Sequence, residues 1–297
     1  MAVDTTMASK SSKALAMRGS YRPVVRLIDI MLTIMAIELI AGGIIVAREM
    51  IETRKIKQQI AQIDEFNSAT SKFYDKYNGL PGDLLSAQAE RMGFPAGDGT
   101  PAHSDGDGKL QPCSPQWHEG LGCETLLFWS QLKAAEMMDT SEAFTAAVQF
   151  TDTRITDTGY LDFYLPKSRL SKELFITVWS ASNPTSLTKR HLPEGNYYEL
   201  TQLHGVEDSK MINDPYAISP IMTKEIDKKL DDGHPFTGKI MVNAKTGPDE
   251  EGWSSFPQTG ILECVTDNQN YNITDYFKAH RALCHIAIAM DCCETDR

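Results

Sequence analysis

The chain has fewer basic than acidic residues, few cysteines and no visible internal repeat. Its 297 residues include 29 Lys and Arg against 40 Asp and Glu, a formal net charge of −11. This excess of acid repels phosphate backbones, so we expect no nucleic-acid partner. Six cysteines are too few for a small disulfide-dense scaffold. Hydrophobic residues make up 41% and charged residues 23%, which excludes a chain that is disordered throughout.

Motifs of the common enzyme classes are also missing. The sequence contains no GxSxG, HExxH, phosphate-binding loop or GxGxxG pattern. Its seven histidines are scattered, and the adjacent acids Asp231 and Asp232 follow a predicted helix, where acidic residues usually form turns. We therefore do not expect an enzyme.

Residues 27–47 contain neither Lys nor Arg and are apolar almost throughout. A helix of this length spans the roughly 30 Å core of a bilayer. Residues 1–26 carry a net charge of +4, so the remaining residues carry −15. The positive-inside rule therefore predicts a basic cytoplasmic leader at 1–26 and an extracytoplasmic C-terminal part. Two acids interrupt the run, Asp29 and Glu38, and acids at such places are usually paired or functional.

Residues 48–78 lack Pro and Gly and continue the helical pattern. Apolar residues recur there at spacings of three and four from Ile56 to Tyr77, which predicts one narrow apolar stripe. Asn78-Gly79 and Pro81 then end the helix. We expect one helix over 27–78, transmembrane in 27–47, followed by a head over 79–297.

Three parts of the chain resemble the type IV pilin and type II secretion pseudopilin superfamily. They are the basic leader over 1–26, the stretch RLIDIMLTIMAIELIAGGIIVAREMI at 26–51 and the stretch YNGLPGDL at 77–84. The narrower resemblance is to proteins with a prepilin-type N-terminal cleavage and methylation region, and EIDKKLDDGHPFTGKI at 225–240 resembles the head of that set. The resemblance implies a long helix with a head of antiparallel sheet and short helices. It also implies a structural subunit that docks on other subunits and on an inner-membrane assembly platform.

Two positions depart from the pattern of that superfamily. Its processing site falls at Val24-Val25, where the superfamily usually has Gly-Phe. Asp29 stands where the superfamily has a Glu that pairs with a neighbouring subunit's N-terminal amine. The chain is then either a divergent subunit or an uncleaved membrane protein of pilin descent, and we expect Asp29 and Glu38 to act in assembly.

The head reads as α+β. A Gly-, Pro- and Asp-rich loop region is expected over 80–122, helices over 124–138 and 220–230, and strands over 161–165, 174–181, 197–203, 239–243 and 284–290. Asp98, Asp105 and Asp107 offer oxygens to calcium, although their spacing matches no EF-hand and a plain solvated loop explains them as well.

The cysteines fall into two groups. Cys113 and Cys123 lie ten residues apart in the loop region, and an oxidising compartment favours a local disulfide between them. In the last quarter, Cys264 is expected to pair with Cys284 or with the adjacent Cys292 and Cys293. A metal site made of His280, Cys284, His285, Cys292 and Cys293 is the alternative.

Two functions remain in view. One is a pilin or pseudopilin-like filament subunit that packs through its N-terminal helix and moves from the inner membrane into a filament. The other is a single-span anchored protein whose periplasmic head binds or adheres to a partner.

Overall fold

The computed structural model describes residues 22–97, 104–112, 121–138, 158–181, 192–207, 210–214, 217–242, 264–266, 270–274, 276–281 and 284–293. It divides into two compact units, unit 1 from Met1 to Ile51 and unit 2 from Glu52 to Arg297.

Helix α1 runs from Arg22 to Tyr77, 56 residues without interruption. It therefore begins five residues before the expected start at Leu27, and it includes Val24 and Val25. Pro23 lies in the first turn, where its fixed φ and missing N–H are tolerated. The helix ends as predicted, because Asn78 has a φ of 54° and leaves the helical conformation.

The part of α1 in unit 2 buries the predicted apolar stripe. Ile63, Phe66 and Phe73 are each at most 2% exposed. The Phe66 ring lies 4.9 Å from the ring of Trp129 and 6.0 Å from that of Tyr198. The stripe is thus the inner face of the core, and the amphipathic pattern is confirmed.

Two glutamines on α1 join it to the segment before the first strand. Gln59 accepts hydrogen bonds from the Ser168 hydroxyl and the Leu170 N–H. Gln62 donates to the Lys167 carbonyl at 2.8 Å and accepts from the Arg169 N–H at 3.0 Å. Because these contacts satisfy buried backbone groups, they define how α1 lies along residues 167–170.

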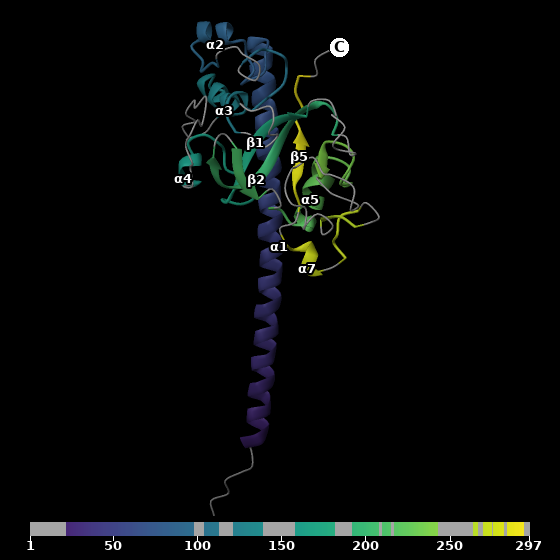
Figure 1. Cartoon of the computed structure of the whole chain (residues 1–297). Coiled ribbons are helices and arrows are strands. Elements are labelled where there is room, and N and C mark those ends of the chain that lie inside the picture. Colours follow the sequence, from purple (N-terminus) through teal and green to yellow (C-terminus); the bar gives the residue numbers. More distant parts are fainter. Residues whose placement is uncertain are drawn as a thin grey trace, which may run out of the picture. The chain divides into compact units, whose positions relative to one another are not determined.

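A five-stranded antiparallel sheet packs on this helix (Figure 1). Its strands are β1 (Leu174–Ala181), β2 (Gly195–Glu207), β3 (Lys210–Asp214), β4 (Ile240–Val242) and β5 (Ile286–Ala289). The order is β1-β2-β5-β4, and β3 pairs with β2 on both sides of a register shift between Leu203 and Gly205. The face that bears Val178, Tyr198 and Ile288 belongs to the main core.

The opposite face of the sheet is buried as well. Trp179, Tyr197 and Ala287 form a second small core there, with the first two rings stacked at 5.5 Å. Glu199 and His285 lie 2.9 Å apart and are both nearly inaccessible to solvent. Both faces of the sheet therefore bear buried side chains.

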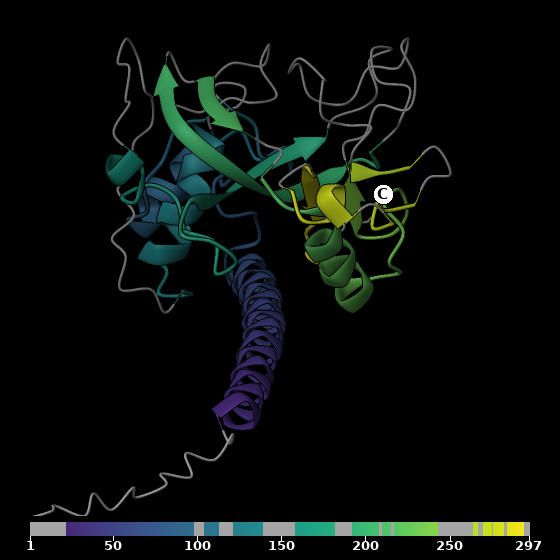
Figure 2. The same cartoon turned by 90° about the horizontal axis from the view of Figure 1, so that it is seen from below.

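The short helices lie beside the sheet in unit 2 (Figure 2). They are α2 (Ser86–Met92), α3 (Glu124–Ala134), α4 (Thr158–Leu161), α5 (Pro220–Leu230) and α7 (Tyr276–Ala279). α5 starts as predicted, because the Ser219 side chain caps the Met222 N–H and Pro220 occupies the first turn. The mixed α+β class, with a long apolar N-terminal helix, is confirmed.

Several local predictions were wrong. Residues 161–165 form a helical turn and bends instead of a strand, because Leu161, Tyr164 and Leu165 are buried at helical spacing. The expected loop region contains α2, whose seven residues lack Gly and Pro. α3 is buried from Glu124 to Leu132 on all sides, so it is not amphipathic. Strand β3 and helix α7 were not predicted.

We expect Phe66→Ala to destabilise unit 2 by about 3–5 kcal/mol, because it leaves a cavity between α1, Trp129 and Tyr198. Denaturant unfolding of the detergent-solubilised full chain measures this. Phe163→Ala is the matched control, since Phe163 is 50% exposed, and it should stay within about 0.5 kcal/mol of wild type. Equal losses in both variants would show that the α1 stripe does not carry the core.

Candidate functional site

The first candidate site is the surface of unit 1, which we call the apolar half-helix and define as residues 27–47. Its described side chains are all exposed, among them Leu39 at 75% and Ile37 at 65%. An 18-residue window of α1 has a mean hydropathy of 2.4, and none of its residues is buried. Helix α1 is therefore long and apolar enough to cross a membrane. Its backbone hydrogen bonds are internal to the helix, as lipid requires.

The two acids of the apolar half-helix lie on opposite faces. Asp29 and Glu38 are nine residues apart, which is about 180° around a helix and about 13.5 Å along its axis. Both are exposed. A single straight neighbouring helix therefore cannot meet both acids, and each needs its own partner in any bundle.

Gly42 and Gly43 give this surface its flattest point. A Cβ built at either glycine meets no atom within 4 Å. Two adjacent residues without side chains allow another helix to approach the backbone closely. Val24 and Val25, the predicted processing positions, lie within the first turn of α1.

The second candidate site is a group of three acids, Asp83, Asp105 and Glu124, which we call the carboxylate cluster. One oxygen of each lies within 4.8 Å of the others. Asp105 was among the predicted calcium ligands, whereas Asp107 is not in the group and Asp98 lies outside the described residues. Sequence reasoning missed Asp83 and Glu124, because they lie 22 residues before and 19 residues after Asp105.

The two buried acids, Asp83 and Glu124, already accept hydrogen bonds from backbone N–H groups. Asp83 accepts from the N–H groups of Gly106 and Gly108 at 2.8 and 2.7 Å. Glu124 accepts from those of Ser104 and Gln111 at 2.8 and 2.9 Å. The two acids therefore fasten both ends of the 104–111 loop to the core, which is a structural role.

The Leu-Pro-Gly-Asp turn brings Asp83 to this place. Gly82 has a φ of 89°, and a Cβ there would meet the Glu124 carbonyl oxygen, so only glycine fits. Its N–H donates to Gln131 on α3 at 2.7 Å, and the same side chain donates to the Pro95 carbonyl. Gln131 thus joins the turn to the segment at Pro95. The turn places the Asp83 carboxyl within hydrogen-bond distance of the 104–111 loop.

Burial raises the pKa of Asp83 to about 7 and that of Glu124 to about 8. The negative charges of Asp107 and Asp105 add to the increase in the pKa of Asp83, and those of Asp83 and Asp105 add to the increase in the pKa of Glu124. The backbone hydrogen bonds oppose both increases. Ca²⁺ takes about six to eight oxygen ligands, and three carboxylates supply only part of that set. The cluster thus anchors the 104–111 loop, and the Asp83 and Glu124 carboxyls bind protons near neutral pH.

A second group of acids follows α5 and also builds turns. Asp227 is buried and accepts from the Tyr271 hydroxyl at 2.5 Å, and burial raises its pKa to about 6. Asp232 accepts from the His234 N–H and the Thr237 hydroxyl. Asp231 accepts from the Lys239 N–H. The prediction that Asp231 and Asp232 form turns is confirmed.

The cysteines of the described residues are all in disulfides. Cys264 pairs with Cys284, with Cα atoms 5.1 Å apart, and Cys292 pairs with Cys293. The first pairing confirms one of the two expected options. The alternative metal site is wrong, because its thiols are bonded to sulfur and His285 contacts Glu199. Cys123 is also disulfide-bonded, while Cys113 lies outside the described residues.

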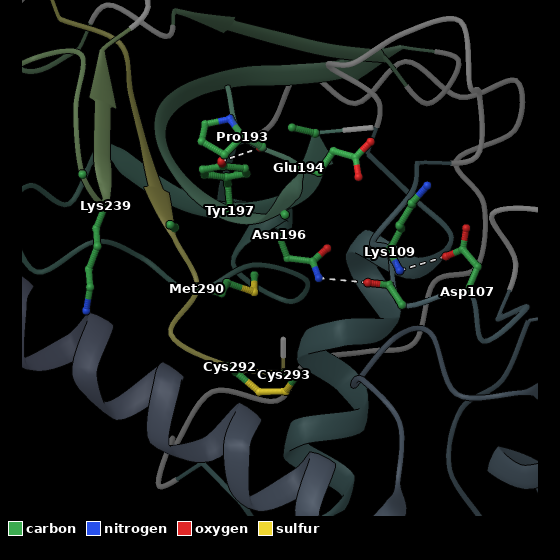
Figure 3. A pocket seen from close by; sticks show the side chains of 15 residues that line it. Asp107, Lys109, Pro193, Glu194, Asn196, Tyr197, Lys239, Met290, Cys292 and Cys293 are labelled. Carbon is green, nitrogen blue, oxygen red and sulfur yellow. Dashed lines mark hydrogen bonds between the residues drawn. A yellow bond between two sulfur atoms is a disulfide. The ribbon is translucent and has the colours of Figure 1, made fainter. Parts of the chain in front are cut away.

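Unit 2 also contains a pocket of about 470 Å³ between the start of β2 and the end of β5 (Figure 3). Tyr197, Met290 and the Cys292–Cys293 disulfide provide apolar walls. Most of its polar groups already have partners: Tyr197 donates to the Pro193 carbonyl, Asn196 donates to the Gly108 carbonyl, and Lys239 pairs with Asp291 at 2.7 Å. The lining therefore combines apolar walls with polar groups.

We expect wild type to have a higher Tm at pH 5 than at pH 8. Asp83 and Glu124 have raised folded-state pKa values, so protons bind the folded chain more tightly than the unfolded one. This contribution is complete below about pH 4, where unfolded carboxyls titrate, and is lost as the pH rises toward about 8. Near-ultraviolet circular dichroism of the detergent-solubilised chain provides the Tm.

Glu124→Gln should flatten this dependence, because the side chain no longer ionises. Glu90→Gln is the control, since Glu90 lies exposed on α2. A wild-type slope in Glu124→Gln would mean that the cluster does not titrate with folding.

Comparison with known proteins finds no match for this chain among family models, curated proteins or solved structures.

Proposed function

We propose that this chain is a filament subunit of the pilin or pseudopilin type, anchored in the bacterial inner membrane before assembly. The observation that supports it most is the apolar half-helix, whose described side chains are exposed along its whole length. The same helix continues into a unit that buries its amphipathic part under a sheet. Such a helix needs lipid or other helices as its surroundings.

The mechanism is an exchange of surroundings. The apolar half-helix is stored in the bilayer with the head in the periplasm, and is then extracted into a bundle of similar helices. Apolar area stays buried in both states, so the exchange costs little hydrophobic free energy. The partners are other subunits, an inner-membrane assembly platform with its ATPase, and membrane lipid.

Asp29 and Glu38 favour the move from lipid into the filament. An acid in lipid costs about 2.5–3.5 kcal/mol near the centre of the bilayer. Because Asp29 and Glu38 lie on opposite faces, two different neighbours in the filament compensate them. Asp29 is near the start of the span and suits docking, whereas Glu38 is central and makes the membrane state less favourable.

We expect Asp29→Ala to abolish incorporation into sheared filaments while the membrane pool remains. Glu38→Leu should enlarge the membrane pool, because the central acid no longer destabilises the helix in lipid. The measurement is the ratio of filament to membrane fraction. Asp64→Ala, an exposed acid of α1 within unit 2, is the matched control. Wild-type ratios in both variants would separate these acids from assembly.

The anchored binding protein is the second candidate, and the pocket in Figure 3 favours it. The two functions differ in whether the chain is cleaved between Val24 and Val25. Mass spectrometry of the N-terminus from native membranes should find a mature chain beginning at Val25 if the filament function holds. A chain that keeps its basic leader has no free amine next to Asp29, and would favour the anchored binding protein.

A further inference from the structure

The two described disulfides of unit 2 differ in how easily another molecule can reach them. Cys264 and Cys284 are both 0% exposed and belong to the main core. Cys292 and Cys293 are partly exposed, and both line the pocket of about 470 Å³ in Figure 3. A thiolate must reach a sulfur atom to break a disulfide. An external thiol therefore meets the Cys292–Cys293 bridge before the Cys264–Cys284 bridge.

The two disulfides also differ in what they join. Cys264 and Cys284 are 20 residues apart in the sequence, so their bridge closes a loop of the chain. Cys292 and Cys293 are adjacent, so their bridge closes a ring that contains a single peptide bond. Because the stabilisation by a disulfide grows with the length of the closed loop, the Cys292–Cys293 bridge adds little to the stability of unit 2.

The backbone at the Cys292–Cys293 bridge has an unfavourable conformation. Cys293 has a φ of 66°, in the left-handed region that residues with a side chain rarely adopt. The Asp291 N–H donates to the Asn67 side chain at 3.2 Å. Beyond Asp291, neither cysteine of the bridge makes a hydrogen bond within the described part of the chain. The bridge therefore keeps Cys293 in this conformation, and opening it lets the backbone relax.

Charges of both signs line the same pocket. Lys109 and Lys239 lie there together with Asp107 and Glu194, and Lys239 pairs with Asp291 at 2.7 Å. Neither sign of charge dominates the approach to the bridge, so an uncharged reductant can enter the pocket without electrostatic repulsion.

We propose that Cys292–Cys293 is a redox-active disulfide, which a dithiol reductant opens in the folded protein while the Cys264–Cys284 bridge stays closed. One thiolate of the reductant attacks a sulfur atom of the bridge, forms a mixed disulfide and releases the other cysteine as a thiol. The second thiol of the reductant then displaces the first cysteine, and the reductant leaves as a disulfide. Two electrons and two protons thus pass to the protein, and two thiols replace the bridge in the pocket wall.

The test is a dithiothreitol titration of the full chain in detergent. N-Ethylmaleimide blocks the thiols that become free, and mass spectrometry of peptides identifies the labelled cysteines. Cys292 and Cys293 should reach half labelling at a dithiothreitol concentration about tenfold or more below that for Cys264 and Cys284. The near-ultraviolet circular dichroism should stay native at that lower concentration, because the core bridge remains closed.

Paired serine variants test whether the Cys292–Cys293 bridge stabilises the fold. Cys292→Ser with Cys293→Ser should shift the Tm by less than about 2 °C, because the bridge joins only neighbouring residues. Cys264→Ser with Cys284→Ser is the matched control, and it should lower the Tm by about 4 °C or more.

Three results would overturn the inference. Labelling of Cys292 and Cys293 before any reductant is added would show that the bridge does not form. Opening of both bridges at one dithiothreitol concentration, or only with loss of the native circular dichroism, would show that the Cys292–Cys293 bridge is not selectively reducible. A loss of Tm as large as that of the control variant would give it a structural role instead.

Discussion

The burial of the α1 stripe under the sheet is the contact on which unit 2 depends. Phe66 meets Trp129 from α3 and Tyr198 from β2 at once, so helix, helix and sheet share one core. Gln59 and Gln62 add directional bonds to residues 167–170. Apolar packing supplies most of the free energy, and the glutamine bonds select one orientation.

One helix is thereby built for two surroundings. Its second half has a single apolar stripe, which the head covers, and its first half is apolar on every side. Without the head the second half would expose its stripe to water, and without lipid or neighbouring helices the first half exposes all of its side chains. The proposed filament function uses this difference, because only the uncovered half is available to other subunits.

Acidic side chains hold several loops of the head in place through hydrogen bonds. Asp83 and Glu124 fasten one loop, and Asp227, Asp231 and Asp232 shape another. Backbone N–H groups are the main donors to these oxygens, so the acids replace secondary structure in regions rich in glycine. Both groups of acids are thus explained by the turns they stabilise.

Local periodicity predicts the long helix, its apolar and amphipathic halves, β1 over 174–181 and the Ser219-Pro220 start of α5. These follow from the spacing of side chains along the chain. Which distant acids meet depends instead on tertiary packing. Asp83, Asp105 and Glu124 come together because the Gly82 turn packs on α3, and spacing contains no sign of that contact. Tertiary packing also made α3 buried on all sides and turned residues 161–165 into a helical turn, since burial among neighbouring elements outweighs local propensity.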